Sequence, residues 1–149
     1  PPPSGPPDAM ARTHRLPPRP ALALLSLGCA TGGGARITID MRNVAGHGYL
    51  PGEVTTLLLA LCFDWVPIPD PNSRREVQTV QQNDEYRMQF EYLETRQVRI
   101  DVRIRRKDGL TRLHFHEPGS NTLSASSRAL LERLQQRVVQ EFGAPNVRY

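Results

Sequence analysis

The chain has few cysteines, few aromatic residues and no long apolar run. Its 149 residues contain two cysteines, so a framework of disulfide bonds is excluded. Its apolar segments are far shorter than the roughly 18 residues that a membrane-spanning helix requires. The sequence also lacks a phosphate-binding loop, a nucleophile elbow and a paired Cys-x-x-Cys motif. We therefore expect a protein without enzymatic activity and without a cofactor.

Length and charge favour a single domain with little affinity for nucleic acid. A chain of 149 residues, 38% of them hydrophobic, suffices for one domain of ordinary size. The formal charge is +4, but residues 29–149 alone carry 16 basic and 14 acidic residues. The aromatic side chains of the predicted strands also fall on the apolar face, where they could not stack on bases. We therefore expect no nucleic-acid partner.

The N-terminal region has the layout of a secretory signal peptide. The first 20 residues contain eight prolines, a density that opposes both helix formation and strand pairing. After Met10, where we expect translation to begin, a leader with arginines at 12, 15 and 19 precedes the apolar run Ala21–Leu27. A basic leader followed by a short apolar run and small residues is typical of a signal peptide.

The leader ends in a motif that carries a family resemblance, Ser26-Leu27-Gly28-Cys29. It resembles the signal of bacterial lipoproteins, in which the cysteine sulfur receives a diacylglycerol before cleavage on the N-terminal side of the cysteine. Gly28 and Cys29 match that pattern, whereas Ser26 stands where leucine is usual and Leu27 where a smaller residue is commoner. The resemblance implies a chain anchored by lipid at Cys29, and Ala30 after the cysteine implies the outer membrane, with the domain facing the periplasm.

These observations divide the chain into three parts. Residues 1–28 form a disordered proline-rich extension and signal peptide, residues 29–34 the lipidated cysteine and a flexible tether, and residues 35–149 a single α+β domain. In the alternative interpretation, residues 21–29 are a buried strand or the first turn of a core helix. The flanking sequences PPRP and GGG leave such an element without a neighbour along the chain.

Alternation and helical spacing of apolar residues predict the elements of the domain. Strict alternation predicts strands over Arg36–Arg42, Tyr86–Tyr92 and Val98–Arg105, and a further strand that ends before Glu117. Helical spacing predicts one helix over Val54–Phe63 and a second from its cap Ser124 to Gly143. Asp64–Ser73 contains three prolines and is expected to be an extended connection. Arg74–Asp84 is expected to hold a short edge strand. Cys62 is expected to be a buried thiol.

Turn signals predict how the strands pair. Asp108-Gly109 favours a two-residue turn that pairs Lys107 with Leu110, and hence Asp101 with His116. A five-residue loop, Leu93–Gln97, sets Phe90 opposite Ile100. The order strand, helix, three strands, helix predicts a two-layer α+β sandwich. Its sheet has about four, mostly antiparallel strands, with two helices on one face and water on the other.

One candidate metal site follows from this pairing. His114 and His116 lie two apart on one strand and point to the same face, where the predicted register also places Asp101. Two imidazoles and a carboxylate are ligands that zinc accepts. The simpler interpretation, an exposed face carrying paired charges, is favoured because a sheet surface is flat whereas ligand sites are concave.

A second candidate site is a group of basic residues near the hairpin tip, namely Arg103, Arg105, Arg106, Lys107 and Arg112. Such a cluster is suited to anionic headgroups or another acidic polymer of the envelope. In the alternative interpretation, these charges only keep the edge of the sheet soluble. His47, which lies between two glycines, is a weaker candidate because glycines serve loops for ordinary backbone reasons.

The sequence therefore predicts a lipid-anchored envelope protein with a small α+β domain of binding or structural role. Its expected partners are the membrane, through the anchor, and an envelope protein or anionic polymer. Two alternatives stay open. One is a metal-binding domain that uses His114, His116 and Asp101, and the other an unlipidated soluble protein that binds an acidic partner through its basic hairpin.

Overall fold

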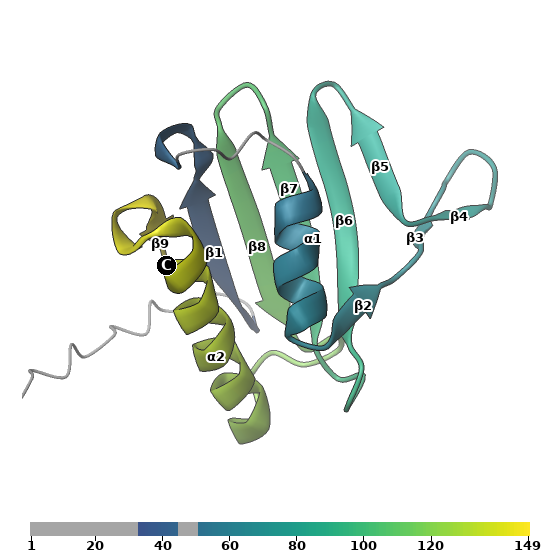
Figure 1. The fold of residues 1–149 in the computed structure, drawn as a ribbon. Helices are drawn as coiled ribbons and strands as arrows, with labels where there is room; N and C mark the ends of the chain where they lie inside the picture. Colours follow the sequence, from purple (N-terminus) through teal and green to yellow (C-terminus); the bar gives the residue numbers. More distant parts are fainter. Residues whose placement is uncertain (1–32, 45–50) are drawn as a thin grey trace, which may run out of the picture.

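The computed structural model describes residues 33–44 and 51–149. The predicted signal peptide, Cys29 and His47 lie outside the described residues. Within the described part, two α-helices lie on one side of a large antiparallel sheet (Figure 1). Gly34, which the sequence analysis assigns to the tether, is the first residue of this sheet.

The main sheet has seven strands in the described residues, in the order β2-β6-β7-β8-β1-β9 with β5 also paired to β6. Their bounds are β1 Gly34–Asp40, β2 Phe63–Trp65, β5 Thr79–Gln82, β6 Glu85–Tyr92, β7 Arg99–Arg105, β8 Leu110–His116 and β9 Val147–Arg148. A separate two-stranded sheet is formed by β3 (Ile68–Pro69) and β4 (Glu76–Val77).

The predicted four-stranded sheet with two helices is therefore wrong. The strands that the prediction lacked are two or three residues long, too short to show an alternating pattern. Asp64–Ser73, expected to be a plain connection, contributes to β2 and contains β3. The edge strand expected within Arg74–Asp84 is present as β5.

Two short strands, β2 and β5, pair with different parts of β6 on the side that faces away from β7. Trp65 of β2 pairs with Phe90, and Thr79 of β5 pairs with Met88. Between them, the carbonyl of Gln89 accepts a hydrogen bond of 2.8 Å from the backbone nitrogen of Val66. The two short strands together therefore cover the side of β6 that faces away from β7.

The two helices pack against one face of the sheet. α1 spans Pro51–Ala60 and α2 spans Ala125–Phe142, and short 3-10 turns follow β1 and α2 at Met41–Asn43 and Ala144–Asn146. As predicted, the side chain of Ser124 caps α2 by accepting from the backbone nitrogen of Ser127, and Gly143 ends it.

The first helix ends earlier than predicted. It stops at Ala60, and Cys62 adopts a left-handed backbone with φ of 65° before the chain enters β2. The thiol of Cys62 is exposed, so the prediction of a buried thiol is wrong. Phe63, expected at the end of the helix, is instead fully buried in β2 and contacts Tyr92, with ring centroids 5.2 Å apart.

The core lies between the helices and the sheet. Alternate residues of β1, β6, β7 and β8 are buried, which is the pattern expected for a sheet with one covered face. The largest fully buried side chains are Phe63, Phe90, Phe115, Ile37, Ile39, Leu58, Met88, Ile100, Ile104, Leu113, Leu134 and Val54. The predicted apolar stripe of α2 is buried against them.

The pairing of β6 with β7 is as predicted, and that of β7 with β8 is not. Phe90 pairs with Ile100. Asp101, however, pairs with His114 and not with His116, because the loop between β7 and β8 spans residues 106–109 and not two residues. The register is therefore shifted by two positions from the prediction, a shift that leaves every side chain on its predicted face.

The two-residue turn lies elsewhere in the chain. Gln82 pairs with Glu85, and the residues between them, Asn83 and Asp84, have φ of 50° and 59°. Positive φ at both central residues is the signature of a type I′ turn, whereas the two-residue turn was predicted at Asp108-Gly109.

Candidate functional site

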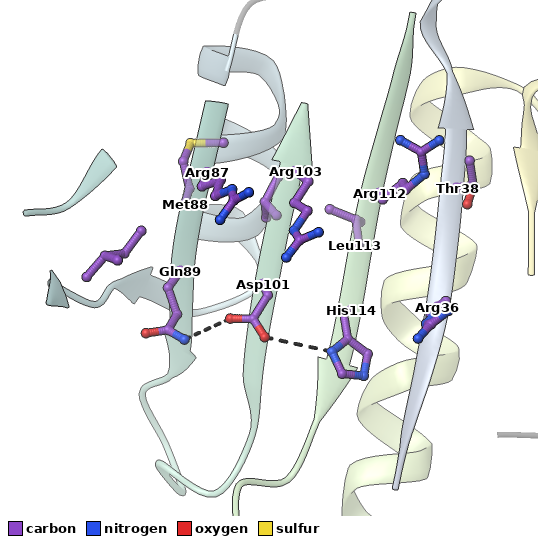
Figure 2. A pocket seen from close by; sticks show the side chains of 12 residues that line it. Arg36, Thr38, Arg87, Met88, Gln89, Asp101, Arg103, Arg112, Leu113 and His114 are labelled. Carbon is purple, nitrogen blue, oxygen red and sulfur yellow. Dashed lines mark hydrogen bonds and ion pairs between the residues drawn. The ribbon is translucent and has the colours of Figure 1, made fainter. Parts of the chain in front are cut away.

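The face of the sheet opposite the helices carries polar residues in rows that run across four strands. One row consists of Arg87 on β6, Arg103 on β7 and Arg112 on β8, followed by Thr38 on β1. The next row consists of Gln89, Asp101, His114 and Arg36, in the same strand order. Figure 2 shows both rows on the open side of the sheet, with the helices behind it.

The first row places three arginines at directly opposed positions, and we call it the arginine row (Arg87, Arg103 and Arg112). Residues opposed across neighbouring strands lie about 5 Å apart at Cβ, and like charges there are destabilising. Nε of Arg87 donates to Glu85 over 2.7 Å, and Nη2 of Arg112 donates to Asp108 over 3.2 Å. Arg103, at the centre, forms no ion pair with any described residue.

The open face is hollowed at these rows. A cavity of about 430 Å³ is lined by both rows, by backbone and side chains of the strands that carry them, and by Ile68 of β3. A flat surface was predicted for this face, whereas the structure has a cavity there. Four guanidinium groups, those of the arginine row and of Arg36, face a single carboxylate among the cavity residues, that of Asp101.

The predicted metal ligands come together in the second row and beside it. Nε2 of His116 lies 2.8 Å, and Nδ1 of His114 lies 3.7 Å, from Oδ2 of Asp101. The two imidazole rings stack with their centroids 4.8 Å apart. Asp101 therefore pairs with His114 in the register and reaches His116 diagonally, so the three residues meet although the predicted register was shifted.

Burial affects the protonation of one of these histidines. Partial burial lowers the pKa of His114 below its usual value, and the neighbouring His116 and Arg36 lower it further, against the opposing effect of Asp101. The lowered pKa favours the neutral form of the His114 ring. A neutral imidazole has a free lone pair on one nitrogen and can act as a metal ligand.

The predicted basic cluster at the hairpin tip is divided in the structure. Nε of Arg105 donates to Glu85 over 2.7 Å, and this carboxylate also holds Arg87. Arg106 and Lys107 lie exposed in the loop between β7 and β8. Of the five predicted residues, Arg103 and Arg112 belong to the arginine row and line the cavity.

Four residues of the two rows were not predicted as site residues, namely Arg36, Thr38, Arg87 and Gln89. Alternation placed each of them on the polar side of its strand, but it gave no strand order for β1 and therefore no neighbour for Arg36. The signal that could have found Arg87 was the pairing of β6 with β7, which was predicted and which sets Arg87 opposite Arg103.

Comparisons with protein-family models, with curated proteins and with solved structures found no match for this chain. In the described part of the chain, neither helix combines the length and the apolar character that crossing a bilayer would require.

Proposed function

We propose that this chain is a lipid-anchored protein of the bacterial cell envelope whose domain binds a phosphate group on the open face of its sheet. The observation that carries the binding part is the arginine row, three arginines at directly opposed strand positions that all line one cavity. The role that we propose is binding and not catalysis.

The charge arrangement supports an anionic ligand. A row of like charges raises the free energy of the folded chain, and an anion seated among them would remove that repulsion. Arg103 has no carboxylate partner within the described residues, while Arg87 and Arg112 each retain free donors beyond their single ion pairs. The row is therefore electrostatically incomplete without a further negative charge.

The number of donors favours phosphate over carboxylate. A carboxylate offers two oxygens, whereas a phosphate group has additional oxygens and more negative charge and can accept from more guanidinium groups at once. Three arginines on neighbouring strands suit the second case. Both free phosphate and the phosphate of a lipid headgroup have this chemistry.

The predicted anchor would hold the cavity close to the membrane. Cys29 precedes Gly34, the first residue of β1, by five positions, so the two are separated by at most about 17 Å of extended chain. Gly34 pairs with His116, next to the row that lines the cavity. An anchor at Cys29 would therefore hold the cavity within reach of the phosphate of a lipid headgroup.

Binding is tested on the purified chain in a Cys29→Ser background, so that a lipid anchor does not itself bind vesicles. The two probes are inorganic phosphate, by titration calorimetry, and phosphatidylglycerol vesicles, by sedimentation. We expect Arg103→Gln to weaken binding at least tenfold and added salt to weaken it in the wild type. Arg128→Gln is the matched control, since it removes the same charge from α2 on the covered side of the sheet. Binding of free phosphate identifies a soluble ligand, and binding of vesicles alone identifies a lipid. Equal binding by both variants, or none by the wild type, would refute the proposed site.

The anchor is tested separately by intact mass. The wild type and Cys29→Ser are expressed in a bacterial host, and the membrane fractions are compared. We expect the wild type to have the mass of residues 29–149 plus a diacylglycerol and an acyl chain, and the variant to lack both. A wild-type chain without added lipid would disprove the anchor and leave the phosphate site to its own test.

A further inference from the structure

Three metal-ligating side chains converge beside the arginine row. One ligand atom from each of Asp101, His114 and His116 can be chosen so that all three lie within 4.8 Å of one another. Zinc bound at about 2.0 to 2.1 Å in a tetrahedral arrangement requires ligand atoms roughly 3.3 Å apart. The distances to Oδ2 of Asp101, 2.8 Å from His116 and 3.7 Å from His114, lie on either side of that value.

We propose that Asp101, His114 and His116 form a binding site for a divalent zinc ion beside the arginine row, with Asp101 and His114 lining the same cavity. Neutral imidazoles and a carboxylate are the ligands that zinc takes in sites with three protein ligands. In such sites the fourth position stays open to water or to an exogenous anion.

The strands hold the ligands in place. His114 and His116 are two residues apart on β8, so both side chains project from the same face, and Asp101 is fixed opposite His114 on β7. Ligands on paired strands have little freedom to separate, because the backbone that carries them is hydrogen-bonded across the sheet. Each ring or carboxylate needs only a side-chain rotation to reach a common metal ion.

A neighbouring amide orients the carboxylate. Nε2 of Gln89 donates a hydrogen bond of 2.7 Å to Oδ1 of Asp101. The other oxygen, Oδ2, is the one that lies toward both histidines. Hydrogen bonds from a second residue to a ligating carboxylate are a regular feature of metal sites, since they fix the direction of the remaining lone pairs.

The chain leaves room for the ring of His114 at β1. A Cβ atom at Gly34 of β1 would lie 2.8 Å from Nε2 of His114 and 2.6 Å from the carbonyl oxygen of Phe115. Any larger residue would displace the imidazole. The glycine therefore permits the ring position that turns Nδ1 toward Asp101.

Nearby positive charge limits the affinity. Arg36 pairs with His114 and Arg99 pairs with His116 in the register, so both guanidinium groups oppose a bound cation. Arg99 is partly offset by Glu91, 3.8 Å away, whereas Arg36 forms no ion pair with a described residue. We therefore expect weaker binding than in a structural site with four protein ligands, and tighter binding in Arg36→Gln.

The test is calorimetric titration of zinc chloride into the full chain in a buffer without phosphate. We expect one ion per chain in the wild type and at least tenfold weaker binding in each of His114→Ala, His116→Ala and Asp101→Asn. The thermal midpoint should rise with zinc in the wild type and not in these three variants. Asp64→Asn, which changes an exposed carboxylate on β2, and Cys62→Ser, which removes the exposed thiol, are the matched controls and should bind as the wild type does.

Several outcomes would overturn the site. They are an absence of zinc binding by the wild type, undiminished affinity in the histidine variants, and loss of binding in Cys62→Ser. Thermal unfolding without zinc checks that each variant is folded. Should a ligand variant fail to fold, Arg36→Gln still decides, because a gain of zinc affinity there requires a cation beside His114, and an unchanged affinity contradicts the proposal.

Discussion

The carboxylate of Glu85 joins β6 to β7, because its Oε2 accepts a hydrogen bond of 2.7 Å from Nε of Arg105. Its Oε1 accepts a second bond of 2.7 Å from Arg87. The side chain of Glu85 is about 10% exposed, whereas both arginines are about half exposed. These hydrogen bonds, that from Arg105 first, hold the pKa of Glu85 below its usual value.

The lowered pKa predicts a stability that depends on pH. A carboxyl group with a depressed pKa in the folded state stabilises the fold above its unfolded pKa, and this contribution is lost as the pH falls through the folded value. We expect Glu85→Gln to lower the free energy of unfolding by about 1 kcal/mol at neutral pH. The two proteins should become equal in strong acid. Urea unfolding across the acidic range measures this, and Glu91→Gln, whose carboxylate makes only a 3.8 Å ion pair with Arg99, should show a smaller difference.

Repulsion within the arginine row predicts that a substitution can stabilise the free protein. Arg103 lies directly between Arg87 and Arg112 and has no carboxylate partner among described residues. Replacing it with glutamine should raise the free energy of unfolding by about 0.5 kcal/mol without ligand. Thermal unfolding at low salt measures the effect, which should shrink at high salt. A loss of stability in Arg103→Gln larger than in Arg128→Gln would mean that the row is held together by contacts that we have not recognised.

In the turn between β5 and β6, a residue that favours strands should destabilise the protein more than glycine does. Asp84 has φ of 59°, a conformation that glycine adopts freely and valine strongly disfavours. We expect Asp84→Val to cost about 1 to 2 kcal/mol, and Asp84→Gly to leave the stability nearly unchanged. Urea denaturation of both variants gives the comparison. If valine were tolerated as well as glycine, the position would be an ordinary strand residue and the turn would be wrongly placed.

The start of α2 predicts the effect of removing its cap. Oγ of Ser124 accepts from the backbone nitrogen of Ser127 and donates to Oε1 of Glu117 over 2.6 Å. Loss of a serine cap typically costs about 1 kcal/mol, and we expect that loss in Ser124→Ala. Ser126→Ala is the control, because Ser126 contacts only the cap oxygen and lies exposed. Equal effects of the two substitutions in thermal unfolding would argue against the cap.

How far the sequence predicts this fold depends on the length of each strand. The strands β1, β6, β7 and β8 have seven or eight residues, enough for alternation to identify them and to assign their faces. The strand β9 has two residues and pairs with β1 only at Thr38 and Ile39, a contact that depends on tertiary packing. No local pattern encodes such a strand.

For the candidate site, the sequence predicted the face on which each residue lies but not the register between β7 and β8. Alternation assigned Asp101, His114 and His116 to one face, and a two-residue shift of register cannot change that, since side chains repeat every second residue. The shift does change which residues are opposed, and it replaced the expected Arg103 and His114 pair with Arg103 and Arg112. The place of Arg112 beside Arg103 in the arginine row could therefore not be predicted without the length of the loop between β7 and β8.

The double pairing of β6 described above also affects how the protein behaves at high concentration. An edge strand with a continuous line of free N–H and C=O groups is where sheets of different molecules join. Along the outer side of β6, β5 and β2 take up these groups in turn, and Val66 binds the carbonyl of Gln89 between them. A second molecule could add a strand there only after β2 or β5 had detached from β6. Two short segments that contribute few residues to the core thus act as a barrier to aggregation along the longest strand of the described domain.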